Sequence, residues 1–257
     1  MISRLPARLP SHYSPAPDLL KDRVILVTGA GDGIGRAAAL SFANHGATVI
    51  LLGKTVEKLE AVYDTIEKAG NPQPAIYPLD LRGATAADYE TLHDTIEREF
   101  GHLDGLLHNA SLLGQRKSIE HTTESDWRDL LQVNVTSNFL LTKALLPLLR
   151  ASEDSSIVFT SSGVGRTGKA YWGAYAVSKF ATEGLMQVLA DELEKITTVR
   201  ANCINPGPTN TQMRRAAYPG ENPSINPDPA QIMPTYLYLL GPDSAGVNGE
   251  SFDAQHR

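Results

Sequence analysis

The chain has 257 residues, of which 42% are apolar and 20% charged, and its formal net charge is −6. This composition excludes a disordered chain, a fibrous repeat and a disulfide scaffold, and the length suits one α/β domain of about 250 residues. An acidic chain has no overall attraction to nucleic acid or anionic lipid, and no apolar run reaches the roughly 18 residues of a membrane span. We therefore expect no nucleic-acid partner and no membrane partner.

The first 20 residues contain four of the 16 prolines, at positions 6, 10, 15 and 17. Prolines at this density disfavour a helix and a central strand, so residues 1–20 are predicted to form an extended arm. They also interrupt the apolar stretch of a signal peptide. Because the single cysteine, Cys203, cannot form an intrachain disulfide, the reducing cytoplasm is the default compartment.

From residue 21 to residue 257 the pattern predicts one domain, in which short apolar runs alternate with stretches of helical periodicity. The predicted strands are Val24–Thr28, Thr48–Leu52, Ala75–Leu79, Leu103–His108, Ser156–Thr160, Val199–Ile204 and Val247–Phe252. The predicted helices are Ile34–His45, Val56–Ala69, Thr85–Phe100, Ser125–Leu149 (as two helices), Trp172–Lys195 and Ala230–Leu240. Nearly continuous apolar strands alternating with helices predict a Rossmann-like, doubly wound parallel sheet of about seven strands in three layers, α/β/α.

The segment 205–229 follows the sixth predicted strand and contains six of the 16 prolines. Loops at the carboxyl ends of parallel strands commonly carry binding residues. The segment is therefore a candidate substrate loop, and the alternative is a plain surface connection.

A glycine-rich turn, Thr28-Gly29-Ala30-Gly31-Asp32-Gly33-Ile34-Gly35, follows the first predicted strand and leads directly into a helix. Glycines let the backbone approach a pyrophosphate closely, and the free amides at the helix start bind the anion. Because the turn lies in the first strand–helix unit of the series, it is predicted to bind a dinucleotide and not merely to close a turn. Its spacing, T-G-x-x-x-G-x-G, differs from the common G-x-G-x-x-G.

This spacing resembles that of the short-chain dehydrogenase/reductase superfamily in its compact form, and the resemblance covers almost the whole chain from Leu20 onward. Within that family the details are most similar to the bacterial YciK-type oxidoreductases: V-I-L-L-G-K-T-V-E-K-L-E, L-D-G-L-L-H-N-A-S, V-F-T-S-S and the D-A-Q near the end. The resemblance implies an NAD(P)-dependent oxidoreductase. Its cofactor contacts in the turn would be Thr28, Gly29, Gly31, Asp32, Gly33, Ile34 and Gly35.

The residues after the second predicted strand bear on the choice of cofactor. An acidic residue near this point binds the adenosine ribose in NAD-preferring relatives, whereas this chain has Gly53, Lys54 and Thr55. Lys54 would neutralise a 2′-phosphate and Thr55 would donate a hydrogen bond to it, so NADP(H) is expected over NAD(H). Alternatively, Lys54 is a solvated lysine at a helix start.

Two further strand ends resemble cofactor-binding elements of the family. Asp80 and Leu81 resemble the adenine contact, although Asp80 could instead cap a turn or the next helix. Asn109 and Ala110 resemble part of the N-N-A-G element. His108 and Ser111 depart from that element, which puts the local hydrogen bonding beneath the cofactor in doubt.

The turn after the sixth predicted strand resembles the one that binds the nicotinamide carboxamide in the family. It contains Pro206, Gly207, Thr209 and Thr211. Thr211 is favoured as the hydroxyl that would contact the carboxamide, and Thr209 is the alternative.

Tyr175 and Lys179 are four residues apart and would share one face of a helix. Ser162 precedes Tyr175 by 13 residues, and Asn134 lies in the helical region before it. In order and spacing these four residues resemble the catalytic Asn–Ser–Tyr–Lys tetrad of the family. Ser161 is the alternative for the serine.

The chemistry fits these residue types. A phenol has a pKa near 10, and a nearby Lys179 ammonium would lower the pKa of Tyr175 enough for acid/base work. The resemblance implies that Lys179 also binds the nicotinamide ribose. It further implies that Ser162 holds the substrate oxygen and that Asn134 positions a water of a proton relay.

The sequence thus predicts an NADP(H)-preferring oxidoreductase that interconverts a carbonyl and an alcohol of a small molecule. One alternative is a non-catalytic dinucleotide-binding regulatory or scaffold protein, and another is use of the same site for dehydration or epimerisation. The seven histidines show no metal-ligand spacing, so no metal is expected. By analogy with the family, the apolar helices Ser125–Leu149 and Trp172–Lys195 predict a homodimer or homotetramer.

Overall fold

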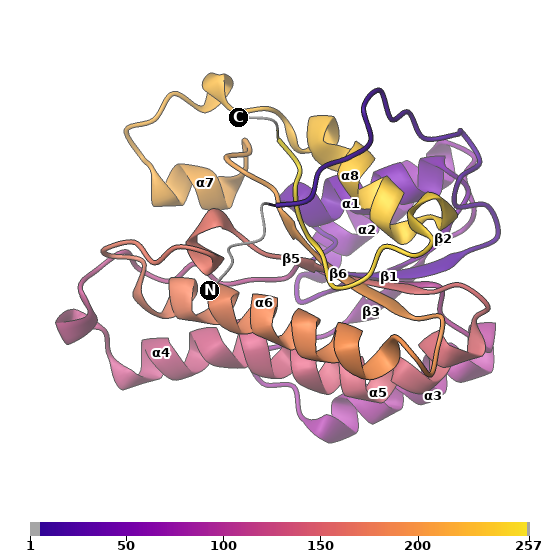
Figure 1. Ribbon diagram of the computed structural model, residues 1–257, viewed down its shortest axis with the longest axis horizontal. Helices are drawn as coiled ribbons and strands as arrows, with labels where there is room; N and C mark the ends of the chain where they lie inside the picture. The colour runs from indigo at the N-terminus through magenta and orange to yellow at the C-terminus, as the bar shows by residue number, and fades with distance from the viewer. Residues whose placement is uncertain (1–5, 256–257) are drawn as a thin grey trace.

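The computed structural model describes residues 6–255 of the chain and contains one seven-stranded parallel sheet between two layers of helices (Figure 1). The strand order is β3-β2-β1-β4-β5-β6-β7. The strands are β1 Val24–Thr28, β2 Thr48–Gly53, β3 Ala75–Pro78, β4 Gly105–His108, β5 Ser156–Thr160, β6 Arg200–Asn205 and β7 Ser251–Asp253. The order reverses between β1 and β4, so the predicted Rossmann-like fold is confirmed, with a crevice expected at that switch point.

The helices cover both faces of the sheet. They are α1 Gly33–Asn44, α2 Val56–Lys68, α3 Ala86–Phe100, α4 Glu124–Leu131, α5 Ser137–Ala151, α6 Gly173–Leu193, α7 Gln212–Ala217 and α8 Met233–Leu240. Figure 1 shows α1, α2 and α8 on one face and α3, α5 and α6 on the other. No helix within residues 6–255 is long and apolar enough to cross a membrane.

The central strands contribute side chains to two hydrophobic cores, one on each face of the sheet. In β1, Ile25 and Val27 belong to the core beneath α1, α2 and α8, whereas Leu26 belongs to the core beneath α3, α5 and α6. Because successive side chains of a strand point to opposite faces, a strand that is buried on both sides has to be apolar throughout. This requirement explains the continuous apolar runs in the sequence.

Two elements differ from the sequence-based expectation. The region predicted as two helices within Ser125–Leu149 contains α4 and α5, joined by a π-helical segment at Gln132–Thr136. The last strand is only three residues long and begins at Ser251 instead of Val247. The backbone before it turns, because Gly246 and Gly249 have φ angles of +81° and +74°.

The described part of the N-terminal segment lies against the domain. Ala7 forms a parallel bridge with Phe252, and its amide donates to the carbonyl of Ser251. Leu20 is fully buried, and Tyr13 packs against the core nearby. Residues 1–5 of the predicted arm lie outside the described residues.

Candidate active site

A cleft of about 600 Å³ opens at the carboxyl ends of the central strands. The predicted site residues that line it are Gly29, Gly31, Asp32, Gly33, Ile34, Gly53, Lys54, Thr55, Asp80, Leu81, Asn109, Ala110, Tyr175, Lys179, Pro206 and Thr211. Six others, namely Thr28, Gly35, Asn134, Ser162, Gly207 and Thr209, are not among its lining residues. The structure therefore brings most residues predicted for cofactor binding and catalysis to one cavity.

The glycine turn leaves no space for side chains at its base. A Cβ on Gly35 would lie 2.2 Å from the carbonyl oxygen of Gly29 and 2.5 Å from Nδ2 of Asn109. Gly29 itself has a φ of +67°, which favours glycine. The start of α1 can thus pack directly beneath the turn, and its amides lie beside the cleft where an anion would bind.

Thr28, at the start of the glycine turn, forms hydrogen bonds to the end of β4 and the residues after it. Its hydroxyl donates to the carbonyl of Leu107 at 3.2 Å and accepts from the amides of Asn109 at 2.9 Å and Ala110 at 3.0 Å. The Asn109 side chain in turn donates to the carbonyl of Thr28 at 3.2 Å. These bonds fix the end of β4 against the end of β1, and so they shape the floor of the cleft.

Asp32 caps α1, because its carboxylate accepts from the amide of Gly33 at 2.7 Å. The same carboxylate forms an ion pair with Lys58 at 2.5 Å. The hydrogen bond from Lys58 is the main reason that the pKa of Asp32 lies below its ordinary value. Lys58 is a cleft residue that the sequence reasoning missed: it lies within the V-I-L-L-G-K-T-V-E-K-L-E segment, but no spacing there indicates its contact with Asp32.

Lys54 and Thr55 lie at the end of β2, on the wall of the cleft beside the glycine turn. The Lys54 side chain is exposed. Arg82, which also lines the cleft, pairs with Asp129 at 3.5 Å. The sequence offered no pattern that would single out Arg82.

Asp80 caps its own turn, because its carboxylate accepts from the amide of Arg82 at 3.1 Å. It does not cap α3, which has its own capping box between Thr85 and Asp88. Of the alternatives for Asp80, the structure shows the turn and leaves its carboxyl group beside the cleft next to Leu81.

The two departures from the N-N-A-G element have distinct surroundings. His108 is buried, stacks on Phe159 with ring centroids 4.7 Å apart, and forms a hydrogen bond of 2.8 Å between Nε2 and the Thr142 hydroxyl. Burial lowers the pKa of His108 to about 3, so the ring is neutral. Ser111 lines the cleft, and its buried hydroxyl has no partner in the described structure.

Tyr175 and Lys179 line the wall of the cleft, and Ser162 contacts Tyr175 from outside the lining. Burial raises the pKa of Tyr175 to about 12, and a hydrogen bond from Ser162 opposes that rise. Burial lowers the pKa of Lys179 to about 8. Its ammonium donates to the carbonyl of Thr160 at 2.8 Å and lies 5.5 Å from the centre of the Tyr175 ring. A phenol, a hydroxyl and an amine are thus held together beside a cavity.

Asn134 lies in the π-helical segment, away from the cleft lining. Its side chain accepts from the amide of Leu112 at 2.7 Å and donates to the carbonyl of Leu112 at 2.9 Å and to Ser178 at 3.0 Å. Asn138 donates to its backbone carbonyl at 2.8 Å. Asn134 therefore ties the loop after β4 to α6, one residue before Lys179, and single π-turns of this kind are frequent at functional sites.

Thr211 caps α7, since its hydroxyl accepts from the amide of Arg214 at 3.1 Å, and it lines the cleft with Pro206. Thr209 is buried and donates to the carbonyl of Pro206 at 3.3 Å. Gly207 packs against the side chain of Gln255 instead of facing the cleft. Of the two threonines, only Thr211 lines the cleft.

The segment 205–229 contains α7, which was not predicted, and this helix reaches over the cleft. Arg116, from the loop after β4, donates to the carbonyl of Ala217 at 2.6 Å. Its guanidinium lies 4.9 Å from the ring centres of both Trp172 and Tyr218. These contacts join three loops around Tyr175 and hold α7 in place.

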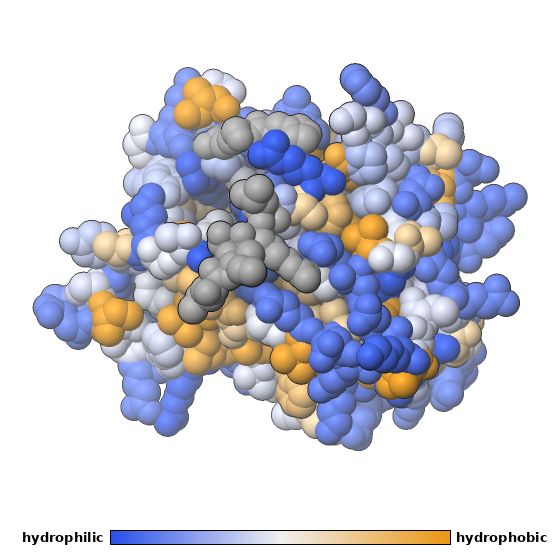
Figure 2. Space-filling model, in the orientation of Figure 1, coloured by the Kyte–Doolittle hydropathy of each residue, from blue (hydrophilic) through white to orange (hydrophobic). Residues whose placement is uncertain are grey.

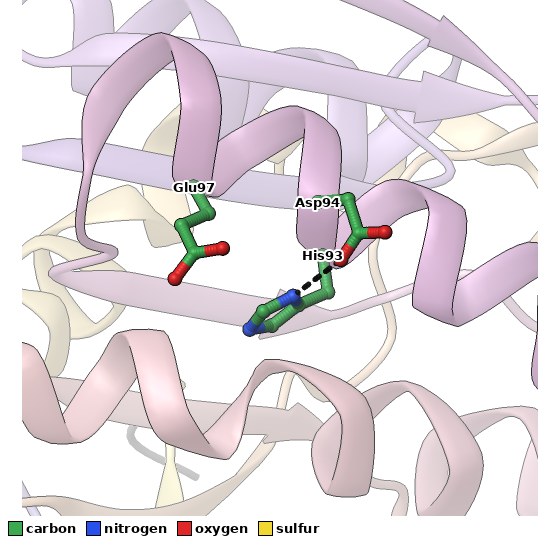
Figure 3. Close-up of side chains that lie close together, drawn as sticks. All are labelled: His93, Asp94 and Glu97. Carbon is green, nitrogen blue, oxygen red and sulfur yellow. Dashed lines mark hydrogen bonds and ion pairs between the residues drawn. The ribbon is translucent and has the colours of Figure 1, made fainter.

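One group of potential metal ligands lies within the described residues, on α3 (Figure 3). It consists of His93, Asp94 and Glu97, and Nδ1 of His93 lies 3.1 Å from the carboxylate of Asp94. None of the three lines the cleft. The two carboxylates are exposed, as is common on the outer face of a helix, and we assign no function to the group.

The fold, the glycine turn and the Ser–Tyr–Lys arrangement agree with the resemblance to the short-chain dehydrogenase/reductase superfamily. Residues 23–222 match the model of the short chain dehydrogenase family, and the chain belongs to that family.

Among its relatives, the chain is 53% identical to YciK, an uncharacterised oxidoreductase of Escherichia coli K12, over 95% of this chain and 96% of that one. The predicted resemblance to YciK-type oxidoreductases is therefore confirmed. A solved protein from Pseudomonas syringae is 61% identical, with a TM-score of 0.93 over 95% of this chain and 98% of that one. A Shigella flexneri protein solved in complex with NADP is 52% identical, with a TM-score of 0.91 over 94% and 100% of the two chains.

Proposed function

We propose that this protein is an NADP(H)-preferring oxidoreductase that reduces the carbonyl group of a small molecule to an alcohol, and catalyses the reverse reaction. The observation that carries the proposal is that Tyr175 and Lys179, one helical turn apart, line the cleft that begins at the glycine turn, and that Ser162 forms a hydrogen bond with Tyr175. The three groups could transfer a proton to or from a substrate oxygen. Because they lie beside the same cleft as the glycine turn, a cofactor bound there could reach the same substrate.

The residues of the cleft fit a dinucleotide. The base of the glycine turn has no space for a Cβ, the start of α1 offers free amides, and Lys54 adds a positive charge at the end of β2. When bound, the cofactor would supply or accept a hydride. Tyr175 would give its proton to the substrate oxygen in reduction and take it back in oxidation, while Ser162 would stabilise the charge on that oxygen.

Lys179 has two tasks in this proposal. Its ammonium would favour the phenolate form of Tyr175, because opposite charges stabilise each other in a buried site. In the structure burial dominates and the pKa of Tyr175 is raised to about 12, so the expected lowering of this pKa is not seen. It would also bind the nicotinamide ribose. Asn134 would act more indirectly, since its side-chain bonds go to Leu112 and Ser178. We propose that Asn134 holds the loop after β4 in place and positions the first water of a proton relay.

The preference for NADP(H) rests on Lys54 and on the absence of an acidic residue among Gly53, Lys54 and Thr55. The NADP complex of the Shigella flexneri relative supports it. Asp80 and Leu81 would contact the adenine, and Thr211 the carboxamide.

The decisive experiment measures NADPH oxidation with a broad panel of aldehydes and ketones. We expect turnover by the wild type and a loss of at least about 100-fold in Tyr175→Phe, because general acid catalysis contributes about 10²–10⁴. Circular dichroism and thermal unfolding check that the variant folds. Tight NADPH binding without turnover of any compound would favour the regulatory or scaffold alternative. Products of dehydration or epimerisation would favour the third interpretation.

We further propose that the protein forms a homodimer or homotetramer through α5 and α6. Phe139 on α5 and Phe180 and Val188 on α6 are about half exposed, at 48%, 46% and 57%. Figure 2 shows hydrophobic side chains over α6 on an otherwise largely hydrophilic face. Exposed apolar side chains that gather on two long helices indicate a surface that a second copy covers.

A further inference from the structure

A buried carboxylate lies one helical turn beyond Lys179. Glu183 on α6 is only 7% exposed. Its Oε1 accepts hydrogen bonds from the hydroxyl of Ser161 at 2.5 Å and from that of Ser251 at 3.0 Å, and Nε of Arg166 lies 3.6 Å away. Burying a charged group is unfavourable unless it is paired and hydrogen-bonded. Each of these three contacts comes from a segment other than α6.

Arg166 connects these segments. It follows the turn Gly163–Gly165 after β5, and its Nη1 donates to Asp253 of β7 at 2.6 Å. Its Nη2 donates to the Ser251 hydroxyl at 2.7 Å and to the carbonyl of Phe252 at 3.1 Å. Arg166 and Glu183 together join the loop after β5 to α6 and to the last strand.

The joined loop carries the groups that contact Tyr175 and Lys179. Ser161 lies between Thr160 and Ser162. The carbonyl of Thr160 accepts a hydrogen bond from Lys179, and Ser162 forms a hydrogen bond with Tyr175. The loop also touches the helix at Lys179 itself, since a Cβ on Gly165 would lie 2.8 Å from the backbone carbonyl of Lys179. Any shift of Ser161 would therefore move both contacts at once.

We propose that Glu183 is a positioning residue for this reaction: through Ser161 and Arg166 it holds the end of β5 in register with the Tyr175–Lys179 turn of α6, and its charge keeps Lys179 protonated. The proposal rests on the proposed oxidoreductase activity for its kinetic part only. Glu183 acts through other residues, since it does not line the cleft.

The charges around Lys179 determine in which direction its pKa should move when Glu183 is neutralised. Burial lowers its pKa to about 8, while Cys203 of β6 and Glu183 oppose that shift. The Arg166 cation faces the same region from the loop, Asp253 faces it from β7, and the Tyr175 phenol lies one turn before it on α6. Neutralising Glu183 leaves the positive charge of Arg166 less compensated, so the pKa of Lys179 should fall by on the order of one pH unit.

The test titrates Lys179 in the full-length protein by NMR, with ¹³C-labelled lysine and Lys179→Met to assign the signal. Glu183→Gln keeps the shape and removes the charge. The matched control is Glu192→Gln, the same change at an exposed position of α6. We expect the midpoint of Lys179 to fall by about one pH unit in Glu183→Gln and to stay in place in the control.

Steady-state kinetics supplies the second measurement. Glu183→Gln should lower kcat about tenfold at pH 8 and leave the KM for NADPH within about twofold, and the alkaline limb of carbonyl reduction should move to lower pH. An unchanged Lys179 midpoint, or a wild-type kcat in Glu183→Gln, would overturn the proposal. If the wild type reduces no carbonyl compound, the proposed function fails, whereas the titration still decides whether Glu183 controls Lys179.

Arg166→Gln should shift the pKa of Lys179 in the opposite direction to Glu183→Gln. It removes a positive charge from the same network, so the Lys179 midpoint should rise, and this variant also decides the question if Glu183→Gln does not fold. A purely structural network would move the midpoint in the same direction in both variants, and that result would also overturn the proposal.

Discussion

Lys54 is the residue on which the proposed cofactor preference depends most. Four cations line the cleft among the described residues, and three of them are engaged: Lys58 pairs with Asp32, Arg82 with Asp129, and Lys179 donates to the carbonyl of Thr160. Lys54 forms no ion pair in the described structure. It is also the cation at the end of β2, where the adenosine ribose of a dinucleotide would lie. Lys54→Ala should therefore weaken the binding of NADPH more than that of NADH.

The exposure of Lys54 sets the magnitude. Two unit charges 4 Å apart interact by about 1 kcal/mol in bulk water and by about 4 kcal/mol at the dielectric typical of a protein surface. An exposed lysine lies near the lower limit, because salt and side-chain freedom weaken the pair. About 1.4 kcal/mol remains for a phosphate partner, and this free energy corresponds to about a tenfold change in Kd.

The assay is a fluorescence titration of the full-length protein with NADPH and with NADH at fixed ionic strength. We expect Lys54→Ala to raise the Kd of NADPH about tenfold and to leave that of NADH within about twofold. The control is Lys195→Ala, an exposed lysine away from the cleft. Equal affinity of the wild type for the two cofactors, or an equal loss for both in Lys54→Ala, would refute the reasoning.

Three other outcomes are expected. Gly35→Ala should weaken the binding of both cofactors at least about tenfold, because its Cβ would overlap the carbonyl of Gly29; unchanged calorimetric affinities would contradict the close packing of the turn. Burial lowers the pKa of Lys179 from 10.5 to about 8. Between pH 8 and pH 10.5 the unfolded chain therefore binds one more proton at Lys179 than the folded chain does. The free energy of unfolding should rise with pH over this interval, by up to about 3 kcal/mol. The Tm advantage of Lys179→Met over the wild type should accordingly shrink between pH 7.5 and 9.5, and a constant difference would contradict the buried charge. Phe180→Glu should shift the protein to a smaller species in sedimentation, whereas Glu192→Gln should not.

The fold could be predicted because its physical requirements are local. A strand buried on both faces must be apolar along its whole length, and a helix on the sheet must repeat its apolar residues every three to four positions. The end of the sheet was harder, because β7 is short. Val247 continues the apolar pattern but belongs to the turn before the strand, where its amide bonds to the carbonyl of Ser244.

The residues in and around the cleft that the sequence missed have partners that are distant in the chain. Lys58 faces Asp32 from 26 residues away, and Glu183 meets Ser251 from 68 residues away. No spacing rule covers such pairs, since their contact depends on how α2 and β7 pack in the finished fold. Trp172 and Tyr218, which enclose Arg116, were likewise brought together only by the packing of α7.

The choice between Ser161 and Ser162 shows how the structure adds to the spacing. Successive side chains at the end of β5 point to opposite sides, so only one of the two hydroxyls can face Tyr175. The hydroxyl of Ser161 is directed to the carboxylate of Glu183 at 2.5 Å, whereas Ser162 forms the hydrogen bond with Tyr175. Exchanging the roles would require a one-residue shift of β5, and this shift would also turn the apolar side chains of the strand to the wrong core. Of the two serines Ser161 lines the cleft, but the contact with Tyr175 and the burial of β5 support our proposal that Ser162 acts with Tyr175 on the substrate oxygen.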